Sequence, residues 1–205
     1  MFLDANRDIQ KHRDRLPHWH QGGTLVFLTW RLADSLPEAA VARILELREA
    51  WREQNPKPWP DSQAAEYNRR FILPLEDKLD DSHGDCVLRQ KEVRRIVCDA
   101  LHYFDQDRYE LDAYVVMPNH VHTLLLLSDQ FPLKDVVHSL KSYTAKEINK
   151  FLGQDGKLWQ RGYWDRLIRS EKQLNWTRSY IAKNPEKLQL GDYSLWHNKE
   201  RRPPA

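Results

Sequence analysis

The sequence predicts an α+β fold in which one antiparallel sheet carries helices on one face. Two extended runs, 109–117 and 120–127, are separated only by Pro118 and Asn119, which favour a tight turn, so they predict a β-hairpin. Helical periodicity precedes and follows this hairpin. The expected order is strand, helix, strand, strand, helix, strand, at residues 24–31, 89–104, 109–117, 120–127, 133–152 and 162–168. This β-α-β-β-α-β order is the plan of a ferredoxin-like sheet.

The first strand follows Gly22-Gly23, and a helix to about Gln54 follows it. That helix begins at Ser35-Leu36-Pro37-Glu38, which has the pattern of a capping box with proline in the first turn. Three prolines then interrupt the chain, so residues 56–88 are expected to be an insertion that contains a further helix.

The helix expected over 133–152 is amphipathic and ends at Gly153. Its apolar stripe consists of Leu133, Val137, Leu140, Thr144, Ile148 and Phe151. Tyr143 and Glu147 are one turn apart on a flank of this stripe, so we expect them to point at the margin of the sheet. A second capping box at Ser170 begins a C-terminal helix.

These elements divide the chain into three predicted parts. Residues 1–21 are polar and form an irregular N-terminal arm, residues 22–190 form one domain, and residues 191–205 form a basic tail. An apolar content of 40% with 11% aromatic residues is enough for a core.

Composition also indicates where the protein acts. No run reaches the roughly 18 apolar residues of a membrane span, and the N-terminus lacks the apolar centre of a signal peptide, so we expect a cytoplasmic protein without membrane contact. Cys86 and Cys98 are the only cysteines and form no Cys-x-x-Cys pair, which excludes a disulfide framework and a zinc knuckle.

The net charge of +2 is unevenly distributed. Residues 1–132 contain 17 Lys/Arg and 22 Asp/Glu, whereas residues 133–205 contain 15 and 8. Tryptophans and tyrosines are interleaved with the basic residues of the second part. This combination favours a nucleic-acid strand as partner, with phosphates on Lys/Arg and bases on rings, although many of these rings are expected in the core.

His120 and His122 follow the predicted turn directly. Alternate strand residues share a face, so the two imidazoles are expected on one side, roughly 6.5 Å apart at Cα. That separation suits one metal ion, and a ligand role removes the desolvation cost of a buried pair. Two histidines on a strand are more often partly exposed residues, so this pair alone leaves both interpretations open.

Four motifs in this chain resemble the single-tyrosine transposases of the HUH superfamily, and most closely their branch associated with repetitive extragenic palindromes (REP). The motifs are residues 117–122 (Met-Pro-Asn-His-Val-His), 140–143 (Leu-Lys-Ser-Tyr), 158–169 (Leu-Trp-Gln-Arg-Gly-Tyr-Trp-Asp-Arg-Leu-Ile-Arg) and 180–185 (Tyr-Ile-Ala-Lys-Asn-Pro). The resemblance spans about residues 22–190 and implies a ferredoxin-like fold and single-stranded DNA as substrate.

The resemblance also implies the site residues. The histidine pair of the family falls on His120 and His122, and its nucleophile falls on Tyr143. The third metal ligand, one helical turn after the tyrosine, falls on Glu147. Family members often carry an amide at that position, so a carboxylate is a departure that could alter the metal preference.

The expected chemistry is metal-dependent cleavage and rejoining of single-stranded hairpins formed by palindromic repeats. Two imidazoles and one oxygen ligand suit Mg²⁺ or Mn²⁺ in use, and attack by Tyr143 leaves a 5′-phosphotyrosine and a free 3′-hydroxyl. The expected phosphate contacts are Lys141, Arg161, Arg166, Arg169 and Lys183, with Trp159 stacking on a base and Lys199, Arg201 and Arg202 adding charge. A monomer is favoured over a dimer.

Two other functions remain open at this level. A ferredoxin-like sheet with basic and aromatic residues also describes a non-catalytic protein that binds single-stranded nucleic acid, although the central strands lack the aromatic pattern of RNA-recognition domains. A metal-dependent phosphodiesterase, in which water attacks, uses the same ligands.

Overall fold

The structure is a computed structural model that describes residues 1–4, 10–13, 17–56, 59–72, 74, 78–79 and 82–199. The chain divides into two compact units. Residues 34–86 form one unit, and residues 1–33 together with 87–205 form the other, which contains the sheet.

The larger unit contains a five-stranded sheet in the order β6-β3-β5-β4-β7, and all neighbouring strands are antiparallel. The strands are β3 (Leu25–Arg31), β4 (Tyr109–Val116), β5 (His120–Leu127), β6 (Trp164–Leu167) and β7 (Ser194–His197). The first four reproduce the arrangement of a ferredoxin-like sheet, which confirms the predicted α+β fold class. β6 and β7 form the two edges.

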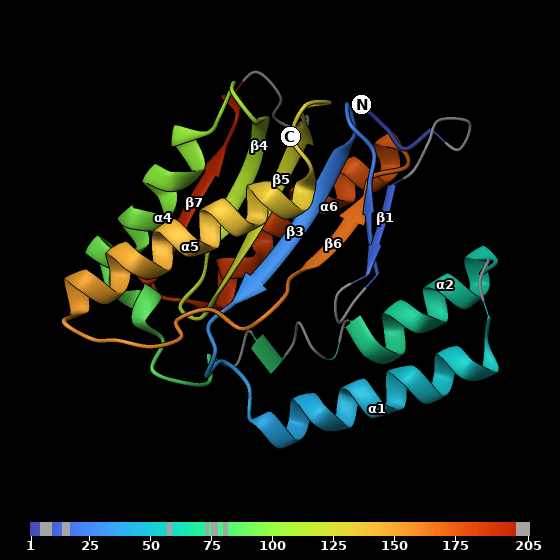
Figure 1. Cartoon of the computed structure of the whole chain (residues 1–205), viewed down its shortest axis with the longest axis horizontal. Helices are drawn as coiled ribbons and strands as arrows, with labels where there is room; N and C mark the ends of the chain where they lie inside the picture. The colour runs from blue at the N-terminus through green and yellow to red at the C-terminus, as the bar shows by residue number, and fades with distance from the viewer. Residues whose placement is uncertain are drawn as a thin grey trace. The chain divides into compact units, whose positions relative to one another are not determined.

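Three helices cover this sheet, and they lie on both of its faces (Figure 1). They are α4 (Lys91–Tyr103), α5 (Leu133–Leu152) and α6 (Glu171–Lys183), with short 3₁₀ turns at Val87–Arg89 and Asn184–Lys187. α4 and α5 pack in front of the sheet in the view of Figure 1, whereas α6 crosses behind it. The C-terminal helical extension therefore covers the face that the two crossover helices leave open.

Strand alternation separates two apolar cores. Val121 and Leu125 of β5 point toward α4 and α5, where they join Leu140 and other residues of α5. Leu124 points the opposite way and joins Phe27 of β3 and Ile181 of α6. Because side chains alternate along a strand, His120 and His122 share the α6 face with Leu124.

The β4–β5 hairpin has the predicted turn at Pro118-Asn119. The backbone N–H of Met117 donates to the carbonyl of His120 at 2.9 Å, which closes the turn. The register pairs Val115 with His122 and shifts at Asp112, where β4 contains a bulge. This register places the two histidines in the centre of the sheet, between β3 and β4.

The helix ends follow their local sequence. α5 ends at Gly153, whose φ of 64° is left-handed and whose N–H bonds back to Asn149 and Lys150. α6 begins at Ser170, whose hydroxyl accepts a hydrogen bond from the N–H of Gln173 at 3.3 Å, as the capping box predicts.

Two predicted segments at the ends of the sequence differ from the structure. The arm predicted over residues 1–21 contains a two-stranded hairpin, β1 (Gln10–Arg13) and β2 (Pro17–His20). The segment 191–205, predicted as a tail, contributes β7 to the sheet because its backbone pairs with β4. Arg201 and Arg202 of that tail lie outside the described residues.

Most of the predicted insertion, 56–88, belongs to the smaller unit, which spans residues 34–86 and so begins well before residue 56. Its helices are α1 (Glu38–Gln54) and α2 (Asp61–Tyr67), followed by a π-helical turn at Asn68–Ile72. Trp51 and Phe71 pack around Tyr67, so this unit has an aromatic cluster of its own. Across the part of the chain that the structure describes, no helix is both long and apolar enough to cross a membrane.

Candidate active site

His120 and His122 form the centre of the candidate site. Their rings lie on one face of β5 with centroids 4.6 Å apart and planes at 75°, and both residues are almost completely buried. Thr29 and Arg31 of β3 lie directly opposite them in the register and therefore share their face of the sheet. The close pair on one face is the arrangement that the sequence predicts.

Hydrogen bonds define which nitrogen each imidazole presents. The Asn119 side-chain oxygen accepts from Nδ1–H of His120 at 2.7 Å, which leaves the Nε2 of His120 as the basic nitrogen. Nδ1 of His122 lies 2.7 Å from the Thr29 hydroxyl, which can accept in the same way. Each ring can therefore direct an Nε2 lone pair into the site, with the other nitrogen anchored as metal-binding histidines commonly are.

Burial keeps both imidazoles neutral. Desolvation lowers the pKa of His120 to about 3. Desolvation, with a smaller effect from the neighbouring His120, lowers the pKa of His122 well below its ordinary value. A neutral imidazole carries a lone pair on one nitrogen, so both rings are in the protonation state that can bind a cation at neutral pH.

Arg31 supplies positive charge beside the pair. Its backbone position is opposite His120, and burial lowers the pKa of its guanidinium to about 10. A group with this pKa remains protonated at neutral pH. The site therefore combines neutral imidazoles with a cationic neighbour, a combination that suits an anionic substrate.

Tyr180 of α6 completes the constellation. Its hydroxyl lies 3.5 Å from Nε2 of His122, and the two ring centroids are 5.3 Å apart. Phe27 contacts both residues: its ring stacks on His122 and makes a T-shaped contact with Tyr180. The structure thus brings a phenol next to the histidine pair, and that phenol belongs to α6.

Tyr143 and Glu147, predicted as nucleophile and third ligand, are on the other side of the sheet. α5 carries them, and its buried stripe packs against the β5 residues that point away from the histidines. The Tyr143 side chain is 52% exposed. The prediction failed because it assumed that α5 and the histidines share a face, whereas the strand residues that contact α5 are odd-numbered and the histidines are even-numbered.

Asn184 has the spacing from Tyr180 that the predicted third ligand has from Tyr143, four residues along the helix. It caps α6 one turn after Tyr180, and its backbone N–H bonds to the carbonyl of Tyr180. Its side-chain oxygen is buried and has no hydrogen-bond partner among the residues the structure describes. An amide oxygen is a hard ligand suited to Mg²⁺ or Mn²⁺.

The motif at residues 180–185 contains Tyr180 and Asn184, but the sequence alone assigned a role only to its Lys183. The usable signal was the pairing of a tyrosine with an amide four residues later, at Tyr180 and Asn184, because such residues lie on the same side of a helix. With Tyr180 as reference, the residue one turn later is an amide, Asn184, in place of the carboxylate of Glu147.

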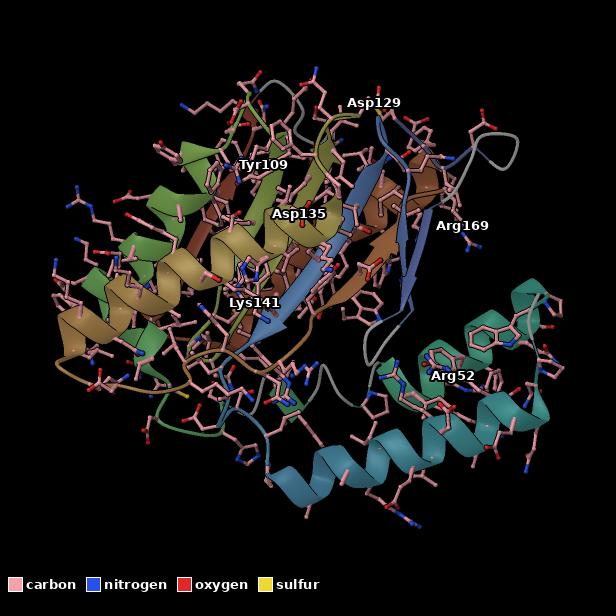
Figure 2. All side chains as sticks on the ribbon, viewed as in Figure 1. Arg52, Tyr109, Asp129, Asp135, Lys141 and Arg169 are labelled. Atoms are coloured by element: carbon pink, nitrogen blue, oxygen red, sulfur yellow. The ribbon has the colours of Figure 1, made fainter. Side chains whose placement is uncertain are left out.

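Two of the predicted DNA contacts have structural partners instead. The Lys141 ammonium donates to the carbonyls of Gln160 and Gly162, and this tethers the segment before β6 to α5 (Figure 2). Trp159 is 5% exposed and donates through its indole N–H to the Thr144 hydroxyl, so it belongs to the core and offers no ring face to a base.

The remaining predicted contacts are closer to the surface. Arg161, Arg169 and Lys183 are exposed, and Figure 2 shows Arg169 directly after β6. Arg166 stacks over the ring of Trp164 at 4.8 Å, and both residues lie on the α6 face because they pair with Phe27 and Thr29 of β3. Arg166 therefore adds positive charge to the side of the sheet that holds the histidines.

Comparisons with known proteins identify transposases that are similar to this chain. A profile described as "Transposase IS200 like" matches residues 87–184, a range that includes both histidines, Tyr180 and Asn184. A Haemophilus influenzae protein, named as a candidate REP-associated tyrosine transposase, is 26% identical over 129 residues, which cover 57% of this chain and 69% of the relative. These matches confirm the predicted resemblance to single-tyrosine transposases and the predicted enzyme class.

A solved structure of a REP-associated tyrosine transposase bound to a REP hairpin is also similar. It shares 17% identity, with a TM-score of 0.43 over 83% of this chain and 71% of that one. A likeness at this level does not establish a common fold, so the fold class comes from the strand order and pairing given above.

Proposed function

We propose that this chain, which resembles the IS200-like transposases, cleaves and rejoins single-stranded DNA hairpins formed by palindromic repeats, with Tyr180 as its nucleophile. The observation that carries this proposal is the 3.5 Å separation between the Tyr180 hydroxyl and Nε2 of the buried His122. A phenol beside two neutral imidazoles provides a nucleophile and a cation site within the reach of one phosphodiester.

We propose that His120, His122 and the side-chain oxygen of Asn184 hold a divalent ion, Mg²⁺ or Mn²⁺. The donor set supports this: two neutral imidazoles present Nε2, and the amide oxygen is buried without a hydrogen-bond partner in the described part of the chain. When bound, such an ion neutralises a non-bridging phosphate oxygen and orients the phosphorus. Asn119 and Thr29 hold the two rings in the orientation that this requires.

The reaction conserves one phosphodiester bond. The Tyr180 oxygen forms a bond to phosphorus while the bond to the 3′ oxygen breaks, so the DNA ends as a 5′-phosphotyrosine and a free 3′-hydroxyl. The tyrosine loses one proton and the departing oxygen gains one. A 3′-hydroxyl from another strand reverses these steps, which joins DNA without ATP.

The contact of Tyr180 with His122 of the same chain supports cleavage within one subunit. A single chain supplies the tyrosine, the histidine pair and the amide, so we expect a monomer to be sufficient for cleavage. The name of the Haemophilus influenzae relative supports palindromic repeats as the source of the hairpin.

Covalent capture tests the proposal and separates it from the alternatives. The probe is a DNA hairpin with single-stranded tails, made from the inverted repeat nearest the gene and labelled at either end. With Mn²⁺, the wild type is expected to retain the label on the 5′-phosphate side in a denaturing gel. Tyr180→Phe removes the attacking oxygen and should abolish the adduct, whereas Tyr143→Phe should leave it unchanged.

Each alternative gives a distinct pattern in the same gel. Release of both labelled fragments without an adduct, in Tyr180→Phe as in the wild type, identifies a phosphodiesterase that uses water. Retention of intact hairpin on a native gel without cleavage identifies a binding protein. Loss of the adduct in Tyr143→Phe but not in Tyr180→Phe would return the nucleophile to α5.

A further inference from the structure

Trp176 lies one turn before Tyr180 on α6 and is 48% exposed. Among the tryptophans whose side chains the structure describes, it alone is exposed. Its ring is nearly parallel to that of Tyr180, with centroids 5.4 Å apart and planes at 14°. An isolated exposed tryptophan needs no special explanation, but this one borders the proposed nucleophile directly.

The rings around Tyr180 form a series that leads from the core to the surface. Phe27 is buried and contacts both His122 and Tyr180. Tyr180 is half-buried and stacks on Trp176, the outermost ring of the series. A flat indole surface is therefore available at the rim of the site, next to the position where a phosphate meets the tyrosine.

The surrounding charges suit a nucleotide more than an apolar partner. Lys172 lies one turn before Trp176 and Lys183 lies two turns after it, so both lie along the same side of α6, and both are exposed. Arg166 and Trp164 flank the same face from β6. A stacking ring between cations is the arrangement by which proteins bind single strands, with bases on rings and phosphates on Lys/Arg.

We propose that Trp176 stacks on a nucleobase next to the scissile phosphate and so positions the DNA strand for attack by Tyr180. This inference rests on the proposed function of the site. A nucleotide attached to a phosphate at Tyr180 must place its base close to that tyrosine, and therefore close to Trp176. Trp159, which the sequence suggested for this role, is enclosed in the other core.

An abasic scan of the hairpin tests this role by binding alone. Hairpins that lack one base at each successive position of the single-stranded tails are titrated with the protein in EDTA, so no cleavage interferes. For the wild type, one position next to the cleavage site should weaken binding about tenfold when its base is missing. Trp176→Ala should bind the intact hairpin about tenfold more weakly, and the same missing base should have no further effect.

Two variants separate stacking from a purely structural role. Trp176→Phe keeps a ring and should recover most of the affinity together with the sensitivity to the missing base. Tyr103→Ala removes an even more exposed ring from α4 on the other face and should bind as the wild type does. Thermal unfolding checks that each variant is folded. If Trp176→Ala is destabilised, Trp176→Phe still tests the stacking role.

The outcomes are distinguishable from those of covalent capture. If Trp176→Ala binds the whole series as the wild type does, or loses affinity at every position equally, the stacking role is overturned. A second outcome is that the missing base weakens binding in the wild type but has no further effect in Trp176→Ala, while the wild type forms no covalent adduct. In that case the stacking role stands and the strand-transfer proposal fails.

Discussion

The two faces of the sheet use the same strands for different purposes. On the α4 and α5 side, Val121 and Leu125 of β5 close an apolar core. On the α6 side, His120 and His122 of the same strand meet the rings of Phe27 and Tyr180. A shift of one residue in the register would exchange the two sets, so the pairing of β5 with β3 and β4 determines where chemistry can occur.

Burial shifts the pKa values of ionisable groups on the two faces in opposite directions. On the α6 side it lowers the pKa values of His120 and His122, so these bases remain neutral. On the other side it raises the pKa values of Tyr109 and Tyr114, so these acids remain neutral as well. The difference is that neutral imidazoles can serve as the proposed metal ligands, whereas these neutral phenols serve packing and hydrogen bonding.

The largest expected difference between the faces concerns ion pairs. Arg178 of α6 makes two hydrogen bonds to the carboxylate of Asp112, which is almost completely buried at the bulge of β4. Asp112→Ala leaves this guanidinium without its counter-charge and should lower the free energy of unfolding by about 3 kcal/mol. Chemical denaturation followed by circular dichroism measures the loss.

The matched control is Asp99→Ala on α4. Asp99 pairs with Arg95 at 3.5 Å, but both side chains are largely exposed, so the change should cost less than about 0.5 kcal/mol. Equal losses for Asp112→Ala and Asp99→Ala would mean that the pair at the bulge does not anchor α6.

The second prediction compares the two candidate oxygen ligands, Asn184 on α6 and Glu147 on α5. If Asn184 contributes the third ligand, Asn184→Ala should raise the Mn²⁺ concentration needed for half-maximal covalent capture by about tenfold or more. Glu147→Ala on α5 should leave the metal titration unchanged, because α5 packs on the other face. A shift in Glu147→Ala that exceeds the shift in Asn184→Ala would reverse this assignment.

The smallest expected effect is alkaline destabilisation through the α4 and α5 face. Tyr109 donates its hydroxyl hydrogen to the carbonyl of Leu101, and burial raises its pKa above the unfolded value of about 10. At high pH the unfolded chain releases this proton and the folded chain keeps it. The contribution of this tyrosine to the free energy of unfolding is therefore fully present below about pH 10 and is lost as the pH rises above it. At pH 11 the loss for one such tyrosine is about 1.4 kcal/mol.

Tyr109→Phe checks this effect by its pH dependence and not by its baseline stability. The variant loses one hydrogen bond at every pH, but its unfolding free energy should fall less steeply between pH 9 and pH 11 than that of the wild type, on the order of 1.4 kcal/mol less over the interval. Parallel slopes for the two proteins would show that Tyr109 already titrates in the folded state.

Much of the fold could be predicted because local signals agreed. Pro118 and Asn119 identify the turn, and alternation from His120 places the histidine pair on one face. β7 could not be predicted, because Ser194–His197 is a short segment in a polar region, and its pairing with β4 depends on backbone hydrogen bonds that leave no pattern in the side chains.

The nucleophile could not be predicted from spacing for a definite physical reason. Leu124–Leu127 is apolar on both faces of β5, so the sequence does not reveal which face α5 covers. Tyr143 and Tyr180 each lie on the flank of an amphipathic helix, and either could face the histidines until the layers are known. Only the packing of α6 with Phe27 and Leu124 decides between them.

The two connections of α6 have a mechanical consequence. The helix follows β6 at one edge of the sheet and precedes β7 at the other, so the chain that carries Tyr180 spans the rear of the sheet and is fastened on both sides (Figure 1). For α6 to insert its tyrosine into a second copy, an edge strand, β6 or β7, would have to separate from its neighbour in the sheet. If Tyr180 attacks DNA as proposed, a covalently attached DNA end would stay where it was cut, and the strand that rejoins it would have to come to the enzyme.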